Sequence, residues 1–163
     1  MEPRAYLAGA TGKPSPAHIV IVIEENHSDT QIIGNAAAPY MNGMAASGAN
    51  FTDWSAVTHP SLPNYLAMFS GSTQGVTNDA CPAPGSPYAA PSIGGELLAA
   101  GKTFVGYSED LPAAGSTECS NGSYQRKHNP WSYFSDVPAS ANQPFTAFPT
   151  DFNDLPTVSY VVP

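Results

Sequence analysis

The chain has 163 residues, of which 42% are hydrophobic, so it is long enough for one domain with an apolar core. Its formal net charge is −8, from 13 acidic and 5 basic residues, and this balance excludes the basic surface that a nucleic-acid-binding protein needs. The longest apolar run, 19–23, has the length of a strand, so no transmembrane segment is expected.

The N-terminal segment, residues 1–17, is predicted to be a flexible leader. It lacks the apolar stretch of a signal peptide, so either the protein is not exported or a leader was removed upstream. Residues 19–23 are apolar and β-branched at every position, which is typical of a strand covered on both faces in a parallel sheet.

Three polar residues, Glu24, Glu25 and Asn26, follow this strand directly. Carboxylate and amide oxygens are the ligands that hard divalent cations prefer, so these residues could hold a metal ion. The alternative is a solvated loop that leads into a helix N-cap at Asn26 or Ser28.

Two helices are predicted in the next part of the chain. The first lies within 36–50, with a proline in its first turn and Gly48 at its end, and the second spans 63–71 and ends at Gly71. Between them, residues 50–57 alternate like a short strand.

Ser61 stands where the N-cap of the second helix is expected. A hydroxyl at that position faces unpaired backbone N–H groups and the positive end of the helix dipole, which favours an alkoxide or a phosphate oxygen. Thr58 offers a second hydroxyl nearby. The alternative is that Ser61 only caps the helix.

The C-terminal half contains an αβ unit within 92–107 and an apolar strand at 158–162. Because helices alternate with apolar strands, we expect an α/β fold with a largely parallel sheet flanked by helices.

The two cysteines, Cys81 and Cys119, lie in loop sequence rich in Pro, Gly and Ser. Two cysteines are too few for a cysteine-rich zinc site, so they form either a disulfide or two free thiols. Their loop positions favour the disulfide and, with it, an extracytoplasmic location, periplasmic or secreted.

The segment 126–134, RKHNPWSYF, holds a cationic cluster in an otherwise acidic chain and predicts a short helix from Pro130. His128 could donate a proton to a leaving oxygen, and Lys127 or Arg126 could balance phosphate charge. The alternative is a solvated loop anchored by a buried Trp131.

Four segments, taken together, resemble the bacterial phosphoesterase family of acid phosphatases and C-type phospholipases, within the alkaline-phosphatase-like superfamily. They are IVIEENHSDTQIIGN, THPSLPNYLAMFSGSTQGVTND, KHNPWSYF and FPTDFNDLPTVSYVVP, and they occur in the expected order within 18–163. The resemblance implies that 18–163 is part of one phosphoesterase domain with the α/β fold of the superfamily. It also implies a metal-dependent hydrolase that cleaves phosphate monoesters through a phosphoseryl intermediate. The alternatives are a phospholipase C-type phosphodiesterase and a non-catalytic fragment that retains the scaffold.

The same resemblance implies a metal site and a nucleophile. The family's E-N-x-S element falls on 25–28, which implies Glu25 as a metal ligand and Asn26 as a ligand of the metal or of the phosphoryl oxygens. Its hydroxyl-x-Pro-Asn element falls on 61–64, which implies Ser61 as the metal-activated nucleophile.

Further substrate contacts are implied by two shorter elements. Asn78, in a Gly-x-x-Asn segment, is a candidate for binding a phosphoryl oxygen. The K-H-N-P element falls on 127–130, which implies His128 as the acid near the substrate and Lys127 as a phosphate-binding residue.

Members of this family continue past SYVVP into further acidic and histidine elements that complete the metal site. Glu25, Asn26 and Ser61 supply at most three protein ligands, so we expect the chain to be an N-terminal portion that is weakly active or inactive by itself. Oxygen ligands permit calcium, magnesium or manganese, and zinc stays open because missing ligands can include histidine.

Overall fold

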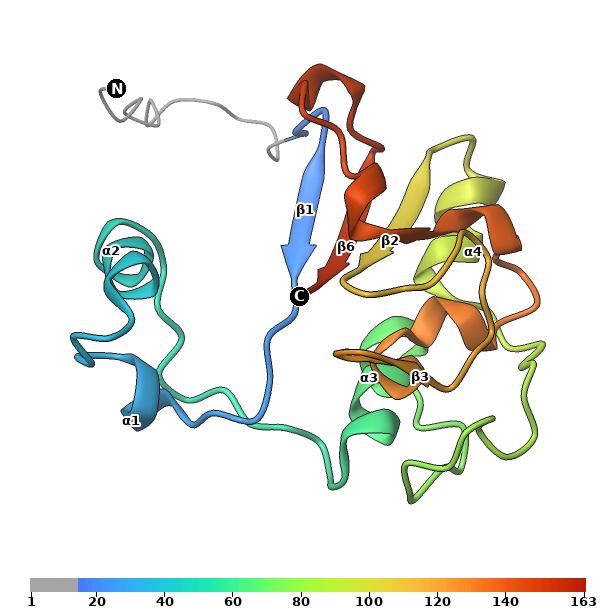
Figure 1. Cartoon of the computed structure of the whole chain (residues 1–163), viewed down its shortest axis with the longest axis horizontal. Helices are drawn as coiled ribbons and strands as arrows, with labels where there is room; N and C mark the ends of the chain where they lie inside the picture. Colours follow the sequence, from blue (N-terminus) through green and yellow to red (C-terminus); the bar gives the residue numbers. More distant parts are fainter. Residues whose placement is uncertain (1–14) are drawn as a thin grey trace.

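The computed structural model describes residues 15–163, and its centre is a four-stranded sheet (Figure 1). The strands are β1 (Ile19–Val22), β2 (Phe104–Ser108), β5 (Asn142–Pro144) and β6 (Val158–Val162). Their order is β1-β6-β2-β5, and every pairing is parallel. The predicted α/β class with a parallel sheet is therefore confirmed. Because the strands are parallel, their carboxyl ends meet at one edge, where ligands bind in open α/β sheets.

One of the two inner strands is β6, which occupies the predicted residues 158–162. Val158 aligns with Ile19 of β1 on one side and with Phe104 of β2 on the other. All five β6 residues are buried, as expected for an apolar strand inside a parallel sheet.

The core is built mainly from aromatic side chains between the sheet and two helices, α3 (Ser61–Ser70) and α4 (Ile93–Ala99). Along α3 the buried residues recur at helical spacing, as Leu62, Tyr65, Leu66 and Phe69. On β2, Gly106 permits the close packing of Trp131, because a Cβ at that position would overlap the indole ring.

The segment after β2 consists of short elements rather than one helix. A hairpin of β3 (Ser120–Asn121) and β4 (Tyr124–Gln125) is followed by two 3-10 turns, η1 (Arg126–His128) and η2 (Pro130–Tyr133). The predicted short helix at Pro130 is thus a 3-10 turn. Three more 3-10 turns, η3 (Ala139–Ala141), η4 (Phe145–Ala147) and η5 (Phe152–Asp154), lead to β6.

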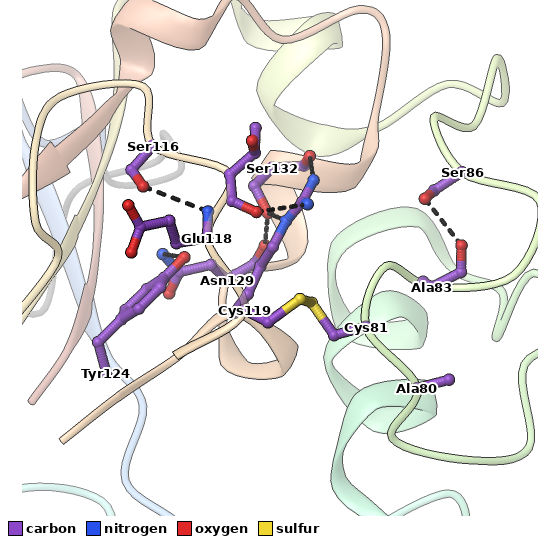
Figure 2. The surroundings of a disulfide bond; sticks show 12 residues. Ala80, Cys81, Ala83, Ser86, Ser116, Glu118, Cys119, Tyr124, Asn129 and Ser132 are labelled. Carbon is purple, nitrogen blue, oxygen red and sulfur yellow. Dashed lines mark hydrogen bonds between the residues drawn. A yellow bond between two sulfur atoms is a disulfide. The ribbon is translucent and has the colours of Figure 1, made fainter. Parts of the chain in front are cut away.

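A disulfide joins Cys81 to Cys119, as predicted (Figure 2). It ties the loop after α3 to the segment that enters the β3–β4 hairpin. The backbone carbonyl of Cys119 also accepts a hydrogen bond from the Arg126 N–H at 3.0 Å. The disulfide therefore holds the loop of Cys81 against the turn that contains His128.

Two predictions for the N-terminal part are wrong. The strand within 19–23 is not covered on both faces, because β1 lies at the edge of the sheet and Val22 is 55% exposed. Residues 50–57 form no strand, and Trp54 is 82% exposed. Residues 50–57 belong to neither of the described sheets, so the alternating pattern has no partner strand to stabilise it.

Two further helices, α1 (Asp29–Ile32) and α2 (Pro39–Ser47), contain no buried residue. They lie apart from α3 and α4, at the left of Figure 1. The helix predicted within 36–50 is confirmed as α2, with Gly48 as its C-cap, and Ser28 caps α1 as one of the alternatives expected.

Most of the predicted leader, 1–17, lies outside the described residues. Within 15–163, the structure contains no helix with the length and apolar character needed to cross a membrane.

Candidate active site

Three other predicted site residues contact the same carboxylate oxygen, Oε1 of Glu25. The Ser61 hydroxyl donates a hydrogen bond to Glu25 Oε1 at 3.1 Å, and the Asn26 amide donates to the same atom at 3.3 Å. His128 Nε2 lies 2.7 Å from it. The site therefore forms just beyond the carboxyl end of β1, where residues from three separate segments meet.

Ser61 is the first residue of α3 rather than its N-cap, which is Pro60. The Leu62 N–H at this end of the helix donates instead to Asp79 Oδ1 at 2.9 Å. The expectation that Ser61 caps the helix is wrong, because Asp79 satisfies the backbone donor and the Ser61 hydroxyl turns to Glu25.

His128 is held between Glu25 and the ring of Tyr65, on which it stacks with a centroid separation of 5.1 Å. Its Nε2 lies close to Glu25 Oε1 without a well-aligned hydrogen bond, and the contact is an ion pair only when the imidazole is protonated. Burial lowers the pKa of the His128 imidazole, and the opposing charge of Glu25 does not cancel that effect.

Tyr65 lies one helical turn after Ser61 and is 4% exposed. Its hydroxyl is buried and has no hydrogen-bond partner among the described residues. Burial raises the pKa of the Tyr65 phenol, and the nearby negative charge of Glu25 raises it further. The phenol therefore remains a proton donor at neutral pH.

A cleft of about 290 Å³ lies at the carboxyl ends of β1 and β6. It is lined by Ile23, Glu24, Glu25, Asn26, Tyr65, Ser123, His128, Val162 and Pro163. A larger cavity of about 610 Å³ lies beyond β2 and β5, but none of the predicted site residues lines it. We place the candidate site in the smaller cleft because Glu25, Asn26 and His128 line it and Ser61 bonds to Glu25.

The expected phosphate-binding cations have other partners. Lys127 Nζ forms a salt bridge of 2.8 Å with Asp79 Oδ2. Burial opposes ionisation of Asp79, but the Leu62 N–H and the Lys127 ammonium outweigh it and lower the pKa of this carboxyl group. Arg126 donates to backbone carbonyls of Thr117 and Ser132, so its guanidinium holds loops together.

Asn78 does not line the cleft. Its side chain is exposed, and its amide oxygen accepts a hydrogen bond from the Ala80 N–H at 3.0 Å, within its own turn. The structure thus brings Glu25, Asn26, Ser61 and His128 together and leaves Asn78 outside this group.

Two residues of the site, Tyr65 and Asp79, were not among those predicted. Tyr65 follows Ser61 by four positions, and side chains with that spacing share one face of a helix, so periodicity contained a signal for it. Asp79 reaches α3 from a loop 17 residues after Leu62, and no local pattern indicates that contact.

The donor chemistry of the site fits a hard divalent cation in part. Glu25, Asn26 and Ser61 offer carboxylate, amide and hydroxyl oxygens, and the Ser61 hydroxyl and the Asn26 amide nitrogen both bond to the Glu25 carboxylate. However, residues 15–163 contain no group of three or more His, Cys, Asp or Glu side chains that could hold a metal ion. These residues therefore supply one section of a coordination shell.

Comparison with known proteins finds curated phosphatases. A phosphatidylinositol-3-phosphatase of Mycobacterium tuberculosis is 54% identical over 163 residues, which cover 99% of this chain and 54% of that protein. An acid phosphatase of Aspergillus fumigatus is 33% identical over 78% of this chain and 31% of its own length. A phosphate-repressible acid phosphatase of Penicillium chrysogenum is 32% identical over 76% of this chain and 32% of its own length. No solved structure matches the chain significantly.

The chain spans about half the length of the mycobacterial relative and about a third of the two fungal ones. The sequence profile of the Phosphoesterase family matches residues 35–163, which is most of the chain. The segment that contains Glu25 precedes that match but lies within the alignment to the mycobacterial protein, which covers nearly the whole chain. The resemblance based on four sequence segments is thereby confirmed, and the chain belongs to the Phosphoesterase family.

Proposed function

We propose that the protein hydrolyses phosphate monoesters, with Ser61 as the nucleophile. The observation that carries this proposal is the hydrogen bond from the Ser61 hydroxyl to Glu25 Oε1, the oxygen that also faces His128. A carboxylate and an imidazole line one cleft, and a hydroxyl is bonded to that carboxylate. These are the groups that nucleophilic phosphoryl transfer needs.

The chain's own residues supply the steps of a two-stage displacement. The hydrogen bond to Glu25 polarises the Ser61 O–H and orients its oxygen. Ser61 Oγ then attacks phosphorus while its proton passes to Glu25 Oε1, so that a bond from phosphorus to Oγ forms and the bond to the leaving oxygen breaks. His128 in its protonated form gives a proton to the departing oxygen, and water then hydrolyses the phosphoserine.

Glu25, Asn26 and Ser61 are the residues that would hold a divalent cation. When bound, such an ion supplies positive charge that acidifies a nearby hydroxyl and offsets the charge of the phosphoryl group. The Asn26 amide nitrogen faces Glu25, so its amide oxygen is the group that remains for a cation or a substrate.

The relatives favour a monoester over a diester substrate, because the three described above are named as phosphatases. Asn78 and Lys127 stay in the proposal as substrate contacts, and Lys127 would have to exchange Asp79 for a phosphoryl oxygen. The disulfide supports an extracytoplasmic location for the protein.

The test is turnover of an aryl phosphate by the chain at high enzyme concentration, with calcium, magnesium, manganese or zinc added separately. We expect Ser61→Ala to lower turnover at least about a thousandfold, because it removes the attacking oxygen. Mass spectrometry of the acid-quenched reaction should find phosphate on Ser61. Chelation by EDTA should abolish turnover, and adding back one of the four metals should restore it.

Ser70→Ala is the matched control, since Ser70 ends the same helix and its hydroxyl donates to the Leu66 carbonyl, away from the cleft. If Ser61→Ala keeps the wild-type rate and Thr58→Ala does not, the assignment of the nucleophile is wrong. Faster turnover of phosphatidylcholine than of the aryl phosphate would point to a phospholipase C-type diesterase instead.

A further inference from the structure

A bound phosphoryl group needs hydrogen-bond donors, and the cationic side chains nearest to the site are already engaged. Lys127 is paired with Asp79, and Arg126 donates to the carbonyls of Thr117 and Ser132. His128 faces Glu25. Unless Lys127 exchanges Asp79 for the substrate, a bound phosphoryl group depends on another donor at the wall of the cleft.

Tyr65 offers such a donor. Its side chain lines the cleft with Glu25 and His128. The Glu25 carboxylate lies near its hydroxyl, but the hydroxyl makes no well-aligned hydrogen bond within the described part of the chain. A buried polar group without a well-aligned partner lowers the free energy of unfolding, so such groups are rare in native proteins unless they have a function. A hydrogen bond to a ligand oxygen when substrate binds would be such a function.

The Tyr65 ring is also held in place before substrate arrives. Tyr65 stands on the buried face of α3, with Leu62 and Leu66 as fully buried neighbours, and its ring stacks on His128. A donor fixed by packing needs no reorganisation when negative charge develops on a phosphoryl oxygen. The stacking also keeps the phenol beside the residue that we propose as the acid.

We propose that Tyr65 is a catalytic residue whose hydroxyl donates a hydrogen bond to a phosphoryl oxygen of the ester bound in the cleft. This inference rests on the proposed function for its role in turnover. Its role in binding inorganic phosphate can be tested separately.

The test is Tyr65→Phe, which removes the hydroxyl and keeps the ring that stacks on His128. We expect kcat/KM for the aryl phosphate to fall roughly 10- to 100-fold, as for the loss of one hydrogen bond to a charged group. The dissociation constant for inorganic phosphate, measured by calorimetry with the activating metal present, should rise. The melting temperature should stay the same or increase, because the hydroxyl has no partner to lose.

Tyr133→Phe is the matched control. The Tyr133 hydroxyl is likewise buried and without a partner in the described structure, but Tyr133 does not line the cleft. This variant should leave turnover and phosphate binding at wild-type values.

The possible results separate this inference from the proposed function. If the wild-type chain turns over substrate and Tyr65→Phe does so equally well, the Tyr65 inference is overturned and the proposed function stands. A fall in both melting temperature and activity would also overturn it, since the hydroxyl would then be structural. If the wild-type chain shows no turnover, as expected for a chain with an incomplete metal site, phosphate binding decides: weaker binding by Tyr65→Phe supports the Tyr65 inference, and equal binding overturns it. A wild-type chain that binds no phosphate overturns the inference.

Discussion

The two parts of the described chain differ sharply in how they are packed. From residue 61 onward, α3, α4, β2 and β6 enclose a core in which Trp131 and Tyr133 are almost completely buried. Before residue 61, β1 is an exposed edge strand, and α1 and α2 bury no residue, as their position apart from the other elements in Figure 1 illustrates.

The candidate site lies across the boundary between these parts. Ser61 and His128 belong to the packed part, whereas Glu25 and Asn26 come from the exposed part. β1 is placed by its backbone pairing with β6, and the His18 ring adds a hydrogen-bonding contact of 3.1 Å to the Pro156 carbonyl. The catalytic geometry that we propose therefore depends on how firmly one edge strand is held.

The largest difference in stability is expected between variants of a buried and an exposed tryptophan. Trp131→Ala should lower the free energy of unfolding by about 3–5 kcal/mol, because it leaves a cavity under Gly106 and beside Phe104. Trp54→Ala should change it by no more than about 0.5 kcal/mol, because this side chain is largely in solvent. Urea denaturation followed by far-UV circular dichroism measures both. Equal losses for the two variants would show that the exposed part is packed in solution.

The disulfide should have the next largest effect, and it lies wholly in the packed part. Replacing Cys81 and Cys119 with serine should lower the free energy of unfolding by roughly 3–4 kcal/mol in the chain-entropy model, since the bond links residues 38 positions apart. Denaturation of the double variant, compared with the oxidised wild type, gives the value. A double variant as stable as the wild type would mean that the two loops stay together without the bond.

A smaller effect is expected from Asp79, whose pKa lies below its ordinary value of 3.8 in the folded protein. A carboxyl group with a lowered pKa stabilises the fold above its unfolded pKa, and that contribution disappears as pH falls through the folded pKa. The stability difference between wild type and Asp79→Asn should therefore shrink below about pH 4. Melting temperatures measured from pH 7 to pH 3 test this.

Asp53→Asn serves as the control for that series, because Asp53 lies in the exposed part of the chain. It should leave the melting temperature unchanged across the same range. A difference for Asp79→Asn that stays constant with pH would contradict the role assigned to the Asp79 charge.

Much of the packed part could be predicted from local patterns. The apolar run at 158–162 indicates a buried strand, and helical spacing of apolar residues indicates α3. The short elements could not be predicted in this way. β3 and β4 are two residues long, and β5 ends in a proline, so none of them carries a repeating pattern.

Four residues of the candidate site were predictable from the sequence, but Tyr65, Asp79 and most of the contacts were not. Family motifs pointed to Glu25, Asn26, Ser61 and His128, which the structure brings together. The engagement of Lys127 by Asp79 joins residues 48 positions apart, so no short motif contains it. Nor does a short motif show that Asp79 accepts the hydrogen bond of the Leu62 N–H, which leaves the Ser61 hydroxyl for Glu25.

By itself, the sequence determined the α/β class, the apolar strand at 158–162, the pairing of its two cysteines and the family to which the chain belongs. These features depend on local periodicity, on composition or on short motifs, all of which are present in the order of residues. Only the tertiary structure decided that β1 lies exposed at an edge, that Asp79 holds Lys127, and that the Tyr65 hydroxyl is left without a partner beside the cleft. Those features depend on which distant segments come into contact, and contact between distant segments is set by packing of the whole chain rather than by any one stretch of it.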